Sequence, residues 1–258
     1  MTVRVFDAHV HFDLRSDDPI RDFESHYSNN CITSCVLILN SETEISLFED
    51  NYERLQDSVG ERMIVAGIFD THTSIPCPRY EKWREWGFRT CLKIHPRKSN
   101  LTKKDSLSLA DKLEGCTENT VIIDCFEYGH RLENHIGIEL GIHLAEHFPE
   151  KRIILAHAGG HRALECMLYT RTLKNIYYDL ALSCNYLYGT SAWIDLVHLV
   201  RYNPNKAMFG SDYPDFSQNA AMEKCLELCE KAELSERNIE SVFFGNAEAV
   251  FGTGFRND

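Results

Sequence analysis

Two histidines, His9 and His11, are separated by a single residue at the end of an apolar run near the start of the chain. In a β-strand every second side chain points to the same face, so we expect Asp7, His9 and His11 to stand in one row. Two imidazoles in such a row offer a compact pair of nitrogen donors to a divalent metal ion. The alternative is a strand that happens to hold two histidines, and this short motif alone does not decide between the two interpretations.

The elements that would position these histidines are short apolar runs separated by segments with helical periodicity. Eight such runs occur, at residues 3–6, 35–39, 63–69, 90–94, 120–123, 152–156, 176–180 and 206–209. Near-continuous apolar strands are typical of a parallel sheet that is covered on both faces. Eight of them alternating with helices predict one domain over residues 1–258, an α/β fold of the (β/α)8 TIM barrel type. A doubly wound open sheet is the alternative, but no glycine-rich phosphate-binding loop follows the first run.

Helical periodicity marks the segments between these runs. We predict helices at 44–59, 78–86, 105–113, 136–148, 161–173, 191–200 and 218–232. Residues 235–251 are expected to form one further helix that packs on the barrel, whereas residues 13–30 show the least regular pattern.

In such barrels the chemistry lies at the C-terminal ends of the strands, and polar residues occur at those positions here. Lys93 and His95 end the fourth run, Asp124 and His157 follow the fifth and sixth, and Asp212 follows the eighth. Each could instead be a turn or core residue, but metal-type ligands at so many strand ends favour the metal-site interpretation of the opening histidine pair.

Other polar residues near the strand ends are expected to have supporting roles. A buried lysine is rare unless it is paired, so Lys93 is predicted to face an acidic neighbour or a substrate carboxylate. His161, which follows a Gly-Gly pair, is a second candidate to bind an anionic substituent. Asp70, His72 and Asp179 are expected to be structural or to support the ligands rather than to be catalytic.

Composition limits the classes of partner. The formal net charge of −12 disfavours nucleic acid, and the densest basic stretch, residues 97–104, is expected to be a solvated loop. No apolar run approaches the roughly 20 residues of a membrane span, and no signal peptide is evident. The ten cysteines include no C-x-x-C pair and are interpreted as reduced, mostly buried thiols. We therefore expect a cytoplasmic protein that acts on a small molecule.

Several motifs together resemble the amidohydrolase superfamily, and within it the metal-dependent hydrolase branch that includes aminocarboxymuconate-semialdehyde decarboxylase. The matching stretches are D-A-H-V-H at 7–11, L-K-I-H-P at 92–96, H-F-P-E-K-R-I-I-L-A-H-A-G-G at 147–160, F-G-S-D-Y-P at 209–214 and F-F-G-N-A-E-A-V-F-G at 243–252. The resemblance covers nearly the whole chain, and by analogy it implies a homodimer formed through outer helices.

The resemblance also implies roles for individual residues. His9, His11 and Asp212 would be metal ligands, and Asp212 would also help to handle the proton of an activated water. His157 would be either a ligand or the base that activates this water. Lys93 matches a lysine that is carboxylated in some superfamily members, where it bridges two metals. In this branch one divalent ion is expected, with zinc as the first choice and manganese or iron as alternatives.

One position departs from the family pattern. Members with a single metal usually have a histidine at the end of the fifth strand, where this chain has Asp124. A carboxylate can still ligate zinc, and a site with two histidines and two aspartates would favour manganese or iron somewhat more. Alternatively, Asp124 is not a ligand and the site is weakened.

These observations predict a metal-dependent hydrolase of a small amide, lactone or carboxylate substrate, with Lys93, His95 and His161 as substrate-binding residues. The same site could support non-oxidative decarboxylation, which the sequence does not distinguish from hydrolysis. A metal-dependent deoxyribonuclease is disfavoured by the net charge and by Lys93, where such nucleases have a glutamate. The non-enzymatic alternative is a degenerate barrel that acts as a binding or regulatory subunit.

Overall fold

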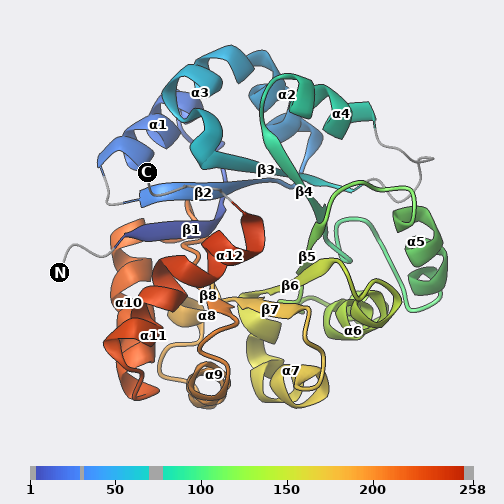
Figure 1. The fold of residues 1–258 in the computed structure, drawn as a ribbon, viewed down its shortest axis with the longest axis vertical. Helices are drawn as coiled ribbons and strands as arrows, with labels where there is room; N and C mark the ends of the chain where they lie inside the picture. Colours follow the sequence, from blue (N-terminus) through green and yellow to red (C-terminus); the bar gives the residue numbers. More distant parts are fainter. Residues whose placement is uncertain (1–3, 30–31, 70–77, 253–258) are drawn as a thin grey trace.

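The computed structural model describes residues 4–29, 32–69 and 78–252, and its parallel strands form a nearly closed barrel (Figure 1). The strands are hydrogen-bonded in sequence order, each to the next, as the sequence predicted for a single-domain (β/α)8 barrel. They are β1 (Val5–Val10), β2 (Ile32–Leu39), β3 (Met63–Ile68), β4 (Arg89–Ile94), β5 (Thr120–Asp124), β6 (Arg152–Ala156), β7 (Ile176–Asp179) and β8 (Ala207–Met208).

Backbone hydrogen bonds join the residues that follow the last strand to the first strand. Ala8 N–H donates to the carbonyl of Phe209 at 3.0 Å, and Asp212 N–H donates to the carbonyl of His9 at 2.9 Å. The second bond places the segment after β8 directly beside the histidine pair of β1.

Helices cover the outside of the barrel, in the order in which the connecting segments occur (Figure 1). They are α1 (Pro19–Asn29), α2 (Glu42–Asp50), α3 (Tyr52–Ser58), α4 (Pro78–Glu85), α5 (Asp105–Leu113), α6 (Gly137–His147), α7 (Ala163–Thr170), α8 (Ser183–Tyr186), α9 (Ser191–Tyr202), α10 (Gln218–Lys231), α11 (Glu236–Glu240) and α12 (Asn246–Phe251).

The structure differs from the predicted helices at four places. Residues 44–59 form two helices, because the chain leaves the helical region at Asn51, whose φ is −124° and ψ is 16°. Residues 235–251 form α11 and α12 joined by a π-helical turn, Ser241–Gly245, instead of one uniform helix. The irregular segment 13–30 contains α1, and the short α8 had no sequence signal of its own.

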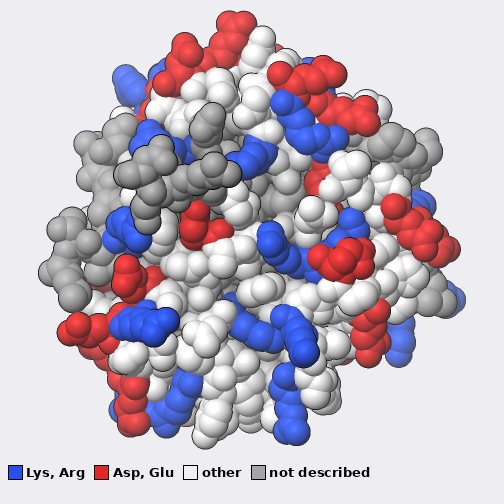
Figure 2. All heavy atoms as spheres, in the orientation of Figure 1, with Lys and Arg blue, Asp and Glu red and all other residues white. Residues whose placement is uncertain are grey.

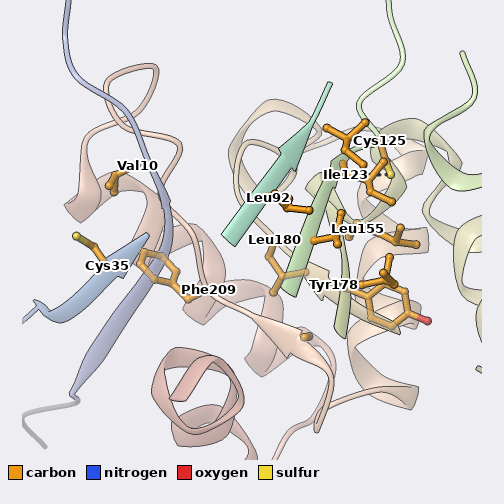
Figure 3. Packing of buried hydrophobic residues seen from close by; sticks show 14 of the residues in the cluster. Val10, Cys35, Leu92, Ile123, Cys125, Leu155, Tyr178, Leu180 and Phe209 are labelled. Atoms are coloured by element: carbon orange, nitrogen blue, oxygen red, sulfur yellow. Dashed lines mark hydrogen bonds between the residues drawn. The ribbon is translucent and has the colours of Figure 1, made fainter. Parts of the chain in front are cut away.

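Two hydrophobic clusters hold these layers together. One fills the barrel interior with alternate strand residues such as Phe6 and Ile154, and it is closed at the end where the strands begin by Ala247 and Val250 of α12. The other lies between the strands and the outer helices; Figure 3 shows part of it, including Tyr178. Burial of both faces explains why the strands are almost continuously apolar.

Helix α12 is also fastened to the strand starts by hydrogen bonds. Arg89 and Arg152, the first residues of β4 and β6, donate to the backbone carbonyls of Gly252 and Val250. On the face of the molecule in Figure 2, acidic and basic side chains are interspersed, so the negative net charge is not gathered there into one patch.

Two further expectations concern the chain as a whole. The eight described cysteines are all buried, as the sequence predicted for most of these thiols. Within the described ranges, no helix is both long enough and apolar enough to cross a lipid bilayer.

Candidate metal centre

A cavity of about 260 Å³ opens among the C-terminal ends of the strands. Its lining residues come from the ends of β1 and β5 and from the segments after β2, β4, β6, β7 and β8, whereas the segment after β3 lies outside the described residues. His9, His11, His157 and Asp212 all line it. The fold thus brings together residues that are as much as two hundred positions apart in the sequence.

Three of these side chains direct one ligand atom each toward a common point. Oδ1 of Asp212 lies 3.5 Å from Nε2 of His9 and 3.6 Å from Nε2 of His11. Bonds of about 2.0–2.2 Å from a tetrahedral zinc ion to nitrogen and oxygen place neighbouring ligand atoms about 3.4 Å apart. These two separations match this spacing, and the three ligand atoms lie within 4.8 Å of one another, so His9, His11 and Asp212 could hold a divalent metal ion.

The other nitrogen of each imidazole ring is held by a neighbour. Nδ1 of His9 lies 2.5 Å from Oδ2 of Asp179, and both side chains are buried. Nδ1 of His11 lies 2.8 Å from the carbonyl oxygen of Ile38 and 3.4 Å from Oε1 of Glu44. Such partners fix the tautomer and the ring orientation of metal-binding histidines. They leave both Nε2 atoms to face Asp212.

Burial and the neighbouring charges shift the pKa values of His9, His11 and Asp212. Burial and the nearby Lys93 lower the pKa of His9 well below its usual value, which favours the neutral imidazole that binds metals. Burial would also lower the pKa of His11, but Asp212 and Glu44 outweigh it and raise that pKa to about 9. For Asp212 burial would raise the pKa, but the neighbouring histidines hold it below its ordinary range.

Close packing beneath the site requires a glycine. A Cβ atom on Gly210 would lie 2.5 Å from Oδ1 of Asp179 and 2.8 Å from Cβ of Ala181, distances that real Cβ atoms essentially never show, and it would make a tight contact of 3.0 Å with Cβ of His9. Asp212 follows two residues later with a positive φ of 57°, which is uncommon for a residue other than glycine. The Gly-Ser-Asp sequence therefore lets β8 end close against His9 and turn the Asp212 carboxylate into the cavity.

His157 lies beside this centre at the end of β6. Its ring centroid is 4.9 Å from that of His9, its Nδ1 is 2.9 Å from the carbonyl oxygen of Ala181, and its Nε2 is 3.2 Å from Oδ2 of Asp124. Burial alone would lower the pKa of His157, but the Asp124 carboxylate outweighs it and raises that pKa to about 9. His157 is thus positioned to hold or transfer a proton next to the metal ligands.

The backbone around His157 is unusual. His157 and Ala158 have positive φ angles of 61° and 50°, and the next two residues are Gly159 and Gly160, also at positive φ. A Cβ on Gly159 would lie 2.7 Å from Cβ of Cys166, so only glycine fits there. Such conformations are found where surrounding structure enforces them, often at functional sites. The A-H-A-G-G sequence therefore matches a tight turn that holds His157 over the cavity.

Comparison with known proteins assigns the chain to a family. The sequence model of the amidohydrolases matches residues 82–253, more than half of the chain. The chain belongs to the amidohydrolase family. This membership supports an enzyme with a hydrolase-type function, and family members generally bind divalent metal ions, in agreement with the His and Asp cluster. No curated protein matches the sequence.

Solved structures resemble the fold at low sequence identity. A dihydroorotase from Saccharomyces cerevisiae in complex with 5-fluoroorotic acid has 12% identity and a TM-score of 0.69, with 97% of this chain and 84% of that chain covered. An uncharacterised TIM-barrel protein from Bordetella bronchiseptica has 14% identity and a TM-score of 0.63, with 92% and 84% covered. An L-hydantoinase from Arthrobacter aurescens has 12% identity and a TM-score of 0.58, with 96% and 71% covered. At these identities the similarity shows the shared barrel.

Asp124, the departure from the amidohydrolase pattern, lies among nitrogen groups. Its Oδ2 atom is 3.6 Å from Nζ of Lys93 and 3.7 Å from Nε2 of His95, in addition to its contact with His157. These neighbours outweigh burial and hold the pKa of Asp124 well below its usual range. Among the described residues, two groups of side chains could share a metal ion: His9, His11 and Asp212, and His9, His157 and Asp179. Asp124 belongs to neither group.

The predicted substrate-binding residues are distributed unevenly. His95 lines the cavity, and burial lowers its pKa to about 3, so it is a neutral side chain there. Lys93 is fully buried beside Asp124 and is not among the lining residues. His161 is exposed and does not line the cavity, because the turn after His157 carries the chain out to the surface. Neither Lys93 nor His161 is therefore a lining residue of this cavity, and their contact with a substrate stays a prediction.

The other polar residues near the strand ends also differ in their positions. Asp179 contacts Nδ1 of His9, which is consistent with a supporting role that stays a prediction. Asp7 does not join the candidate ligands, because its carboxylate accepts hydrogen bonds from Ser211 N–H and the Gln218 side chain. Asp70 and His72 lie outside the described residues. Glu44 lines the cavity but was not predicted as a site residue, although the Ser41–Glu44 spacing is that of a capping box. Arg97 and Lys98 also line the cavity, whereas the sequence placed them in a stretch expected to be a solvated loop.

Proposed function

We propose that this amidohydrolase is a metal-dependent hydrolase that cleaves an amide, a lactone or a related carboxyl derivative of a small substrate. The observation that supports this most directly is the convergence of His9 Nε2, His11 Nε2 and Asp212 Oδ1 within one cavity at the strand ends. A degenerate binding barrel would have no reason to keep this geometry, with both histidines oriented by partners of their own.

Binding of one divalent ion by His9, His11 and Asp212 is part of the proposal, with zinc first and manganese or iron as alternatives. When bound, such an ion supplies Lewis-acid activation of a carbonyl group and of a water molecule at neutral pH. Asp124 was predicted as a fourth ligand; its position beside Lys93 and His157 supports a role in holding His157 instead.

The chain's own residues account for the movement of protons. The Asp212 carboxylate, at the edge of the cavity, is placed to accept a proton from the attacking water. His157 Nε2 is held by Asp124, and its Nδ1 faces a backbone carbonyl, so Nε2 is the atom that can deliver a proton to a leaving group. Burial of these groups keeps bulk water away from the transfer.

A panel assay tests the function. Zinc-loaded protein is incubated with small amides, lactones and carboxylic acids, and the products are followed by mass spectrometry together with a CO2 sensor. We expect hydrolysis of at least one amide or lactone, lost in Asp212→Asn and kept in the matched surface variant Asp195→Asn. CO2 release without hydrolysis would contradict the proposal in favour of decarboxylation, the chemistry of the predicted aminocarboxymuconate-semialdehyde decarboxylase-like branch.

A further inference from the structure

We propose that Arg97 and Lys98 bind a carboxylate group of the substrate, so that the cavity accepts small amides or lactones that carry a carboxylate. This inference rests on the proposed hydrolytic function and specifies its substrate class. The role replaces the one predicted for Lys93, which is fully buried beside Asp124 and does not reach the cavity lining.

Arg97 is held in place at the cavity without a carboxylate. Arg97 and Lys98 follow β4 and line the same cavity as the candidate metal ligands. The guanidinium carbon of Arg97 lies 3.8 Å from the centroid of the Tyr128 ring, and the guanidinium donates a hydrogen bond to the Tyr128 hydroxyl. Stacking on an aromatic ring orients the planar guanidinium and leaves its other N–H groups available.

Arg97 forms no salt bridge among the residues that the structure describes, and the charge of Lys98 is partly balanced by Glu44 without a salt bridge. No described carboxylate forms a salt bridge with Arg97 or Lys98, and Nε of Arg97 is buried without a described hydrogen-bond partner. The Nζ of Lys98 lies 3.5 Å from the Asn40 carbonyl oxygen, and the Lys98 side chain is exposed. Buried donors are normally satisfied, and a planar fork of donors beside a second cation is suited to a carboxylate.

The acidic side chains of the cavity do not favour a cationic ligand instead. Asp124 and Asp212 face the nitrogen groups described above, and Glu44 faces His11. The fourth lining acid, Asp215, follows β8, whereas both cations follow β4. Arg97 is therefore the lining cation that pairs with no described acid, and an anionic group of the substrate would lie beside it and Lys98.

The test compares matched pairs of ligands that differ only in the carboxylate. N-acetylglycine, N-acetylphenylalanine and N-acetylglutamate are each compared with their C-terminal amides by ligand-observed NMR. The full chain is used zinc-loaded and, in a second arm, after treatment with a chelator. We expect at least one acid to bind about tenfold more tightly than its amide in both arms. Arg97→Met should abolish this preference and Lys98→Met should reduce it, whereas the exposed control Lys231→Met should keep it.

The outcomes separate this inference from the proposed function. A preference that is absent in every pair, or that survives in Arg97→Met, overturns the inference; a preference seen only in the zinc-loaded arm means that the carboxylate binds the metal, and overturns it equally. If Arg97→Met does not fold, as judged by circular dichroism, Arg97→Lys keeps the charge but loses the fork and should show a weakened preference. An Arg97-dependent preference in a protein that hydrolyses nothing would support the inference while rejecting the hydrolase.

Discussion

Nδ1 of His9 lies 2.5 Å from Oδ2 of Asp179, and each of the two side chains is only 1% exposed. The Asp179 carboxylate is itself fixed, because its Oδ1 accepts a hydrogen bond from Ala181 N–H at 2.8 Å. The end of β7 thus sets the direction of an imidazole on β1. This pair determines that Nε2 of His9, and not Nδ1, faces His11 and Asp212.

Replacing Asp179 should therefore weaken metal binding although Asp179 is not a ligand in our proposal. In Asp179→Asn the ring of His9 loses its anionic partner, and we expect zinc affinity to fall by about 10- to 100-fold. Competition with a fluorescent chelator measures the dissociation constant. Asp215→Asn, a change of the same kind at the cavity lining, serves as the control and should bind zinc normally. Equal affinities for Asp179→Asn and the unaltered protein would show that the pair does not position His9.

The packing of Gly210 gives a second prediction. A methyl group there would displace Asp179 or His9, so Gly210→Ala should lower the free energy of unfolding by about 1–3 kcal/mol and also weaken zinc binding. Gly245→Ala is the matched control, because its new Cβ would meet nothing closer than Ser241 Oγ at 3.8 Å. Urea denaturation and zinc titration of both variants provide the measurements. If Gly210→Ala were as stable as Gly245→Ala, the close approach at the end of β8 would be refuted.

The buried ion pair between Lys93 and Asp124 predicts a coupling in stability. Lys93→Met leaves the Asp124 carboxylate without its ammonium partner, and we expect a loss of about 3 kcal/mol in the free energy of unfolding. The double variant Lys93→Met, Asp124→Asn removes both charges and should recover part of this loss. Chemical denaturation of the two single variants and the double variant completes the cycle. Strictly additive effects would mean that the two side chains do not interact.

Metal should also stabilise the folded chain. An ion that binds only the native state at a hundred times its dissociation constant adds about 2.7 kcal/mol to the free energy of unfolding. We expect zinc to raise the melting temperature of the unaltered protein by roughly 5–10 °C and to leave that of His11→Ala unchanged. Differential scanning fluorimetry in chelator-treated buffer makes the comparison. A similar rise in both proteins would place the stabilising ion elsewhere.

The barrel could be predicted from sequence because burial on both faces leaves a direct trace. Runs such as 152–156 and 120–123 are apolar after their first residue, and their regular alternation with helical segments allows few other folds. Details that depend on backbone angles were less accessible. The break at Asn51 and the π-helical turn at Ser241–Gly245 interrupt segments whose hydrophobic periodicity continues.

The candidate site could be predicted where residue type and strand position agree. His9, His11, His157 and Asp212 follow this rule, and all of them line the cavity. His161 lies outside this cavity, because the direction of the chain after the Gly-Gly pair depends on positive φ angles that the spacing does not encode.

Two further details of the site required three-dimensional information. The burial of Lys93 below the lining, and the exposure of Arg97 to the cavity, depend on which way each side chain leaves β4 and the loop after it. Sequence alone showed only a buried-looking lysine and a short basic stretch.

Metal content measures the central claim most directly. Protein reconstituted with zinc and freed of excess ion by gel filtration is analysed by plasma mass spectrometry, alongside His9→Ala, His11→Ala and Asp212→Ala. His161→Ala, an exposed histidine away from the cavity, is the control. The account predicts about one zinc ion per chain in the unaltered protein and the control, and a loss of most of it in the three cavity variants. Full zinc content in His9→Ala and His11→Ala would contradict the metal centre.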